Sequence, residues 1–526
     1  MREEWLIMGS QERQIVRLKV FRYDPEVDER PRYEVYEVPY YRGMKVLDAL
    51  IYIHDKYDPT LAFRYSCKIW RCGSCAVRVN GDARPACRAE IEPGKEYVIE
   101  PLANLPVIRD LVVDFSKIYK RFASLGPYFV TTKPRDKEPA RIPGHKFEDF
   151  IKVAGCIECW SCISVCPIVK VAWSEMAGPG LMVALAQSAY NPLNEHDPLP
   201  IAFAQGLYSC TTCRKCTEVC PEEIAIPEVV FEKLRAIAVK RGMGPLPGHL
   251  IPKNLIETTG KSVVRKETPF LEIIEAEVFK PSETIVDRVG FFTGCLADYR
   301  LQHVAKAVLD MLLRLGVEVV VPKDQVCCGS PMIRTGVLSA LERLVRQNVA
   351  SFEKFNVKTI VTACAGCSLT LKKNYPGLVK EILKREMPFK VYHMSEYLID
   401  VLKRKPPMKK ELRMKVTWHD PCHLSRGQGI YKEPRELLTS IPGIQFIEML
   451  GADQCCGAGG GVRSGKRELS ELVGTNKAKL IINSGAEAVV TECPFCVIQI
   501  RDMLDALGYG HIKVFYLEEL LRQAMD

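Results

Sequence analysis

The sequence predicts a multidomain α+β protein in which a domain of strands and one helix precedes a mostly helical domain and a duplicated α/β domain. The chain has 526 residues, which suits three or four domains of ordinary size. The spacing of apolar residues changes along the chain from strand-like alternation to the period of a helix. Finally, the 22 cysteines fall into three kinds of spacing, and the second and third kinds each occur twice.

Residues 10–110 are expected to form the first domain. Alternating apolar residues predict a first strand whose buried face consists of Val16, Leu18 and Val20. A second strand is expected over Tyr33–Pro39, and apolar residues at helical spacing predict a helix over Lys45–Lys56. Residues 111–240 are expected to be mostly helical, and residues 241–285, which begin with a Pro/Gly-rich stretch, are expected to form a linker.

The first cysteine motif predicts a [2Fe–2S] cluster. Its spacing is C-x4-C-x2-C with a later fourth cysteine, which is the plant-type ferredoxin pattern. The predicted ligands are Cys67, Cys72, Cys75 and Cys87. The small residues Gly73 and Ser74 leave room for backbone amides to approach the cluster. Zinc is the alternative for four cysteines, but the uneven spacing favours the two-iron cluster and, with it, a β-grasp ferredoxin domain.

Two runs of the bacterial ferredoxin type follow, each C-x2-C-x2-C-x3-C-P. In such runs the fourth cysteine ligates the other cluster, so the two runs predict two [4Fe–4S] clusters in a helical ferredoxin domain. The first is expected to use Cys156, Cys159, Cys162 and Cys220. The second is expected to use Cys166, Cys210, Cys213 and Cys216. A pair of zinc ribbons is the alternative, and the spacing disfavours it.

The N-terminal half resembles the iron–sulfur subunit of succinate dehydrogenases and fumarate reductases. The resemblance rests on residues 66–76 around the first motif, on residues 101–111, and on the order of the cluster motifs, and it extends from residue 15 to about residue 240. Ordinary members of that family lack a cysteine at the place of Cys213 and hold a three-iron cluster there. The departure at Cys213 implies a four-iron cluster instead and puts in doubt the quinone chemistry beside it.

Residues 286–400 and 410–526 are predicted to be two copies of one domain. In each copy a strand leads to a cysteine, a Cys-Cys-Gly follows, and a second strand leads to a Cys-x2-Cys. The first set is Cys295, Cys327, Cys328, Cys364 and Cys367. The second set is Cys422, Cys455, Cys456, Cys493 and Cys496. Five cysteines exceed the four that a cubane needs, and adjacent cysteines on an extended backbone point in different directions, so a less regular cluster is favoured.

The cysteines at the ends of these second strands, Cys364 and Cys493, are expected to begin helices, whose N-termini favour thiolates. The repeated pattern resembles the CCG domains of heterodisulfide reductase, most clearly at residues 419–423 and 455–461. That resemblance implies a noncubane [4Fe–4S] cluster in each copy, and a zinc ion in one copy remains the alternative.

Three further side chains of the second copy are candidates for contacts with cluster or substrate: His419, His423 and Arg426. Their alternative roles are to orient the loop or to lie on a solvated surface. The glycine run 457–461 follows Cys-Cys rather than a strand, so no flavin or NAD site is expected on this chain.

Composition excludes several functional classes. The net charge is +9, but no Lys/Arg-rich block suggests nucleic acid binding. No apolar run approaches the roughly 20 residues of a membrane span, and the first residues lack the apolar region of a signal peptide. A cytoplasmic protein is therefore expected, or one that is peripheral at the inner face of the membrane through a partner. Met8 is an alternative start.

The combination of the two halves resembles the thiol:fumarate reductases. This implies that the thiols of coenzyme M and coenzyme B are oxidised to the heterodisulfide at the C-terminal clusters. Electrons would then pass to a separate FAD-containing flavoprotein that reduces fumarate to succinate. The alternative is a succinate:quinone oxidoreductase iron–sulfur subunit fused to a CCG-type membrane-docking module, for which an amphipathic segment over Tyr516–Met525 is the candidate. An electron adaptor for a lactate- or glycolate-type oxidase fits the N-terminal half poorly.

Overall fold

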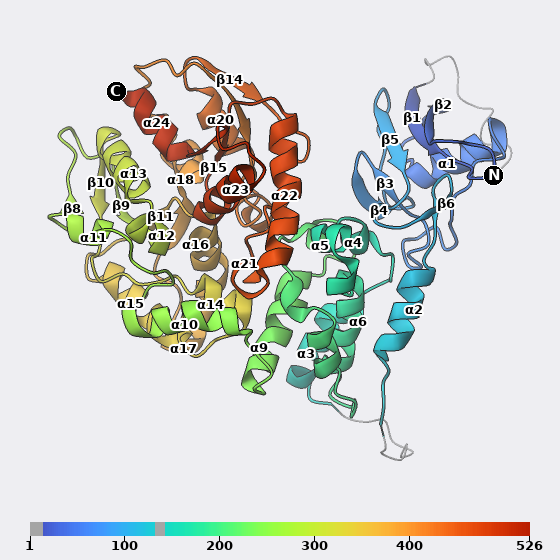
Figure 1. Cartoon of the computed structure of the whole chain (residues 1–526), viewed down its shortest axis with the longest axis horizontal. Coiled ribbons are helices and arrows are strands. Elements are labelled where there is room, and N and C mark those ends of the chain that lie inside the picture. The colour runs from blue at the N-terminus through green and yellow to red at the C-terminus, as the bar shows by residue number, and fades with distance from the viewer. Residues whose placement is uncertain (1–13, 132–141) are drawn as a thin grey trace. The chain divides into compact units, whose positions relative to one another are not determined.

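The computed structural model describes residues 14–131 and 142–526 (Figure 1). The alternative start at Met8 and the first residues of the predicted first domain lie outside the described residues. The chain divides into two compact units. The first contains the chain up to Gly206 together with Lys215–Val230, and the second contains Leu207–Arg214 together with Phe231–Asp526.

The first unit begins with a five-stranded sheet of order β2-β1-β5-β3-β4. Its strands are β1 (Ile15–Arg22), β2 (Arg32–Pro39), β3 (Ala76–Val79), β4 (Asp82–Pro85) and β5 (Glu96–Glu100). Strand β1 pairs antiparallel with β2 and parallel with β5. The predicted buried face of β1 is confirmed, because Val16, Leu18 and Val20 are fully buried and pack with helix α1 (Val46–Lys56).

A buried arginine joins this sheet to the segment that leads into the first cysteine motif. Arg22, at the end of β1, is 3% exposed, and its guanidinium donates to Asp110 at 3.1 Å and Glu34 at 2.9 Å and also pairs with Asp58. Asp110 in turn accepts the backbone N–H of Ala62 at 2.8 Å. A buried guanidinium needs such partners, so this network fixes the start of the loop that carries Cys67.

Within residues 111–240, the part of the chain that the structure describes is mostly helical, as predicted. The helices are α2 (Ser116–Leu125), α3 (Gly144–Ala154), α4 (Ser161–Ser164), α5 (Pro167–Val171), α6 (Pro179–Tyr190), α7 (Leu199–Ala204), α8 (Lys215–Glu218) and α9 (Lys233–Lys240). A short ribbon of β6 (Val107–Arg109) and β7 (Val112–Val113) precedes them. Helix α6 is buried on nearly every side because its residues are almost all apolar.

The second unit contains two separate sheets, one for each copy of the predicted repeat. The first sheet has the order β12-β11-β9-β10-β8 and the second the order β14-β13-β15-β16. All pairings are parallel except that of β8 with β10. The strands are β8 (Val278–Phe279), β9 (Asp287–Phe291), β10 (Val317–Val320), β11 (Thr359–Thr362), β12 (Lys390–His393), β13 (Met414–Trp418), β14 (Ile444–Ile447), β15 (Ala488–Thr491) and β16 (Lys513–Tyr516).

Helices follow these strands, as parallel connections require. The first copy contains α12 (Gly294–Tyr299), α13 (Gln302–Arg314), α14 (Ser330–Thr335), α15 (Leu341–Glu353), α16 (Ala365–Leu369), α17 (Tyr375–Leu383) and α18 (Met394–Glu396). The second contains α19 (Ser425–Gln428), α20 (Lys432–Thr439), α21 (Val462–Gly465), α22 (Arg467–Asn483), α23 (Pro494–Ala506) and α24 (Leu517–Met525). Residues 241–285 carry α10 (Pro247–Thr259) and α11 (Phe270–Ile273).

The prediction that the C-terminal segment Tyr516–Met525 faces a membrane is wrong. Helix α24 buries its apolar residues in the protein core, where it packs on α13. The buried residues are Leu517, Leu520, Leu521, Ala524 and Met525. Its amphipathic pattern is therefore used inside the protein. Within residues 14–131 and 142–526, no helix has both the length and the hydrophobicity that a bilayer span requires.

Candidate iron–sulfur sites

The first predicted ligand set converges on the loop between α1 and β3. The sulfurs of Cys75 and Cys87 lie 3.4 Å apart. The backbone N–H of Trp70 donates to the Cys87 sulfur at 3.2 Å, and that of Arg71 donates to the Cys67 sulfur at 3.3 Å. Hydrogen bonds from N–H groups stabilise thiolates, which are the form that ligates iron.

The two ends of this set differ in exposure. Burial raises the pKa of the Cys75 thiol to about 12, so this side chain needs a cation to become a thiolate at neutral pH. Cys72 is exposed, and although partial burial opposes it, a hydrogen bond with the Ser74 hydroxyl at 3.1 Å lowers the Cys72 pKa to about 6.

Gly73, within this loop, brings the first set close to the next one. It has φ +69°, and a Cβ atom added there would lie 2.5 Å from the Ile157 carbonyl oxygen and 2.9 Å from the Cα of Cys159. Only glycine permits such an approach. The loop of Cys72 and Cys75 therefore packs directly on the loop of Cys156 and Cys159.

Gly73→Ala is expected to separate these two loops and to lower the [2Fe–2S] content of the purified protein. The matched control is Gly81→Ala, because Gly81 has φ +88° but no atom within 4 Å of the added Cβ. Both variants carry the backbone strain of about 1 kcal/mol that a positive φ costs. Iron analysis and the visible absorption spectrum should show the loss in Gly73→Ala alone, and equal losses in both variants would contradict the close approach.

The second predicted set lines a small cavity. Cys156, Cys159, Cys162 and Cys220 all line it, together with apolar side chains such as Ile224. Burial raises the pKa of Cys156 to about 12, and it raises the pKa of Cys162 well above the usual value of a thiol. Four thiols that share one cavity fit a cluster of iron cations, because the positive charge stabilises their thiolate forms. All 22 cysteines lie in the described part of the chain, and none forms a disulfide.

The third predicted set is divided between the two units. Cys166 and Cys216 belong to the first unit, whereas Cys210 and Cys213 lie in Leu207–Arg214, which belongs to the second. This ligand set stays a prediction.

The ten cysteines of the repeat all line one cavity of about 380 Å³ in the second unit. They approach it from matching elements of the two copies. Cys364 and Cys493 each occupy the position immediately before a helix, α16 and α23, which confirms the predicted helix starts. The shared cavity itself could not be inferred from spacing.

Hydrogen bonds support thiolates in both copies. The N–H of Cys367 donates to Cys364 at 3.4 Å, and the N–H of Gly457 donates to Cys455 at 3.3 Å. The sulfurs of Cys456 and Cys496 lie 3.4 Å apart. This concentration of buried sulfur around a cavity fits a metal cluster, since free thiols would gain no comparable stabilisation there.

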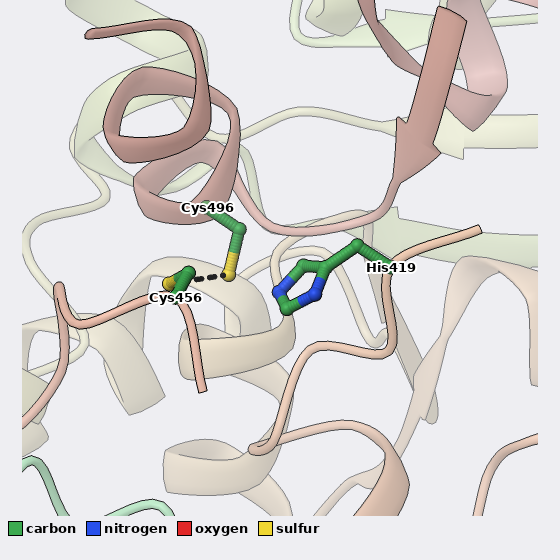
Figure 2. A group of neighbouring side chains, drawn as sticks. All are labelled: His419, Cys456 and Cys496. Atoms are coloured by element: carbon green, nitrogen blue, oxygen red, sulfur yellow. Dashed lines mark hydrogen bonds between the residues drawn. The ribbon is translucent and has the colours of Figure 1, made fainter. Parts of the chain in front are cut away.

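The predicted accessory residues occupy different places. His419 lies against Cys456 and Cys496, with one potential ligand atom of each residue within 4.8 Å of the others (Figure 2). His423 lines the cavity, and burial holds its pKa well below the usual value, so its imidazole is neutral. Arg426 instead donates to the Cys213 carbonyl at 3.2 Å and to the Asp453 carboxylate at 2.8 Å, and thereby joins two chain segments.

Two arginines of the cavity wall, Arg334 and Arg467, were not predicted, and the wall also contains Arg463. Arg334 also pairs with Glu232, and Arg463 with Asp502. A signal for Arg334 exists in the repeat, because in each copy an arginine follows Cys-Cys-Gly after a short interval.

Comparison with known proteins identifies iron–sulfur and cysteine-rich domains in this chain. Models of a 2Fe-2S iron–sulfur cluster binding domain match residues 17–120, a 4Fe-4S dicluster domain matches residues 152–224, and a cysteine-rich domain, CCG, matches residues 289–372 and 416–501. A crystal structure of a hypothetical protein from Helicobacter pylori is similar in fold, with a TM-score of 0.63, 15% identity, and coverage of 98% of this chain and 96% of the other.

Two curated relatives cover most of the chain. One is a subunit of the fumarate reductase (CoM/CoB) of Methanothermobacter marburgensis, and it is 46% identical over 97% of this chain and 99% of its own. The other is a subunit of the dihydromethanophenazine:CoB–CoM heterodisulfide reductase of Methanosarcina barkeri, which is 31% identical over 72% of this chain and 95% of its own. The domains and relatives together define an iron–sulfur subunit of an oxidoreductase. The chain belongs to the family of the fumarate reductase (CoM/CoB) subunit that it matches over nearly its whole length.

Proposed function

We propose that this chain oxidises the thiols of coenzyme M and coenzyme B at the ten-cysteine cavity and delivers the electrons to an FAD-containing flavoprotein that reduces fumarate. Two thiols lose two protons and two electrons as one S–S bond forms, and fumarate takes up two protons and two electrons to become succinate. The observation that carries this proposal is the single cavity onto which both five-cysteine sets open.

The proposed cofactors are one [2Fe–2S] cluster, two [4Fe–4S] clusters and two noncubane [4Fe–4S] clusters, one for each predicted ligand set. Such clusters, when bound, supply one-electron steps and iron atoms that hold a thiolate. Two sets at one cavity suit a reaction that releases two electrons, since each set can take one.

The cavity wall offers contacts for anionic thiols. Arg334, Arg463 and Arg467 supply guanidinium groups, which form strong paired hydrogen bonds with sulfonate or phosphate. Arg467 is the most exposed of them, with about half of its side chain accessible, so it lies where a substrate would enter. The neutral imidazole of His423 can accept a hydrogen bond from an S–H group.

The flavoprotein is proposed to dock on residues 60–90. Cys72 is exposed there, and three large apolar side chains near it are exposed as well: Tyr65 at 46%, Ile69 at 62% and Trp70 at 42%. Apolar residues grouped around an exposed ligand are typical of a surface that a partner covers. The [2Fe–2S] cluster would then be the last carrier on this chain.

The test is electron paramagnetic resonance of the anaerobically purified, oxidised protein titrated with coenzyme M. We expect a paramagnetic signal that appears only with the thiol and is lost in Cys455→Ser. The control is Cys87→Ser, which removes a ligand of the first set and should leave the thiol-dependent signal in place. A protein with its full iron content and no such signal would overturn the proposal.

A further inference from the structure

The two five-cysteine sets occupy equivalent positions but have different neighbours. Phe292 is the first residue after β9, and its N–H donates to the Val361 carbonyl at 2.9 Å. His419 is the first residue after β13, and its N–H donates to the Val490 carbonyl at 2.9 Å. Because β9 and β13 begin the two copies, Phe292 and His419 are structural counterparts.

Phe292 gives the first set an apolar neighbour. Its side chain is fully buried in one core cluster with Cys328 and Cys367 and stacks on Phe352 with a centroid distance of 6.3 Å. A phenyl ring offers no N–H group to a sulfur.

His419 gives the corresponding cysteines of the second set a polar neighbour. The ring is 1% exposed, and one of its nitrogens lies within 4.8 Å of the sulfurs of Cys456 and Cys496 (Figure 2). A neutral imidazole always carries one N–H, so it can donate to a thiolate.

A second residue difference between the two copies also makes the surroundings of the second set more polar. Asn348 lies as far before Cys364 as Lys477 lies before Cys493. Asn348 is uncharged and donates to the Tyr375 hydroxyl oxygen at 2.9 Å. The buried Lys477 ammonium instead donates to the carbonyls of Gly451 and Ala452, both at 2.9 Å. Its positive charge acts on Cys456 and Cys496 of the second set.

The second set also contacts the segment that carries two predicted [4Fe–4S] ligands. The side chain of Cys455 is hydrogen-bonded to that of Cys213, and the Thr211 hydroxyl lies 3.5 Å from the Cys455 sulfur. A Cβ atom added to Gly460 would lie 2.2 Å from the Cys210 carbonyl oxygen, so the Cys-Cys-Gly loop fits tightly against this segment.

We propose that the second set holds the electron-accepting cluster of the pair and that His419 is the positioning residue that raises its reduction potential. Hydrogen bonds to cluster sulfurs and nearby positive charge favour the reduced, more negative cluster. The inference rests on the proposed function, which places a cluster in each set. Cys422, Cys455, Cys456, Cys493 and Cys496 would hold this cluster, which would supply a one-electron acceptor for the thiols, and Cys455 would place it beside the segment that carries Cys213.

The test is a redox titration of the whole complex, followed by electron paramagnetic resonance, with Cys295→Ser and Cys455→Ser to assign the two signals. We expect His419→Phe to lower the equilibrium constant for reduction of the second cluster by about tenfold. This corresponds to a midpoint potential that is lower by about 59 mV for one electron. The reciprocal variant, Phe292→His, should raise the equilibrium constant for reduction of the first cluster. His419→Asn, which keeps an N–H donor, should restore much of the loss.

If the second signal keeps its midpoint potential in a His419→Phe protein with full iron content, the inference is overturned. It is also overturned if the midpoint potential of the first signal shifts instead. If His419→Phe does not retain its iron, the same measurement is made on Lys477→Asn. We expect a lower midpoint potential of the second cluster in that variant, and an unchanged midpoint potential would contradict the inference. The absence of both C-terminal signals in the unaltered complex would instead overturn the proposed function on which the inference rests.

Discussion

Replacing Arg235 with methionine is expected to destabilise the second unit by about 3–5 kcal/mol, the range for a buried charged group that loses its partners. The guanidinium is fully buried and donates to four backbone carbonyls. These belong to Leu207 at 2.9 Å, Arg334 at 2.6 Å, Gly460 at 2.9 Å and Cys210 at 2.8 Å. Methionine fills part of the same volume but leaves the carbonyls without donors. Each buried carbonyl that lacks a hydrogen bond costs about 1–3 kcal/mol.

The change should appear as a lower midpoint in calorimetric unfolding and as faster proteolysis within Leu207–Arg214. The control is Lys240→Met on the same helix, α9, where the side chain is exposed. An exposed substitution of this kind changes stability by no more than about 0.5 kcal/mol. If the two variants unfolded alike, the four hydrogen bonds of Arg235 would not stabilise the unit.

Cys213→Ala is expected to convert the predicted third cluster from four irons to three. The resemblance to succinate dehydrogenase-type subunits implies that ordinary members lack a cysteine at the place of Cys213. Its side chain also contacts Cys455, so its loss would remove a predicted ligand and a link to the second set at once. We expect thiol-dependent fumarate reduction to fall by about 10- to 100-fold, the usual range when the environment of a metal site is altered.

The measurement combines iron analysis with electron paramagnetic resonance of the oxidised protein, in which a three-iron cluster is paramagnetic and a four-iron cluster of this type is not. Cys213→Asp is the matched control, because a carboxylate can still ligate the fourth iron. Retention of all iron and of full turnover in Cys213→Ala would show that Cys213 is not a ligand.

Local patterns in the sequence predict much of this structure. The alternation of Val16, Leu18 and Val20 specifies the buried face of β1 because a strand turns successive side chains to opposite sides. The strand-to-cysteine pattern likewise predicts that helices begin after Cys364 and Cys493. These features depend only on neighbours in the chain.

Features that depend on distant parts of the chain could not be predicted. The helical period of α24 identifies an apolar face but does not reveal whether α13 or a membrane covers it. The spacing of Cys295 and Cys422 says nothing about a common cavity, which arises from the packing of two separate sheets. The ion pair of Arg334 with Glu232 is equally invisible, because these residues are 102 positions apart.

The placement of Leu207–Arg214 in the second unit has a consequence for how such a protein can be divided. A gene split within residues 241–285 would yield two polypeptides, but the C-terminal one would lack the strip of chain that lies against Gly459 and Gly460. Its carbonyl-binding arginine at position 235 would also remain on the other polypeptide. The two products would therefore have to reassemble as obligate partners, with a surface built for permanent contact instead of transient encounter.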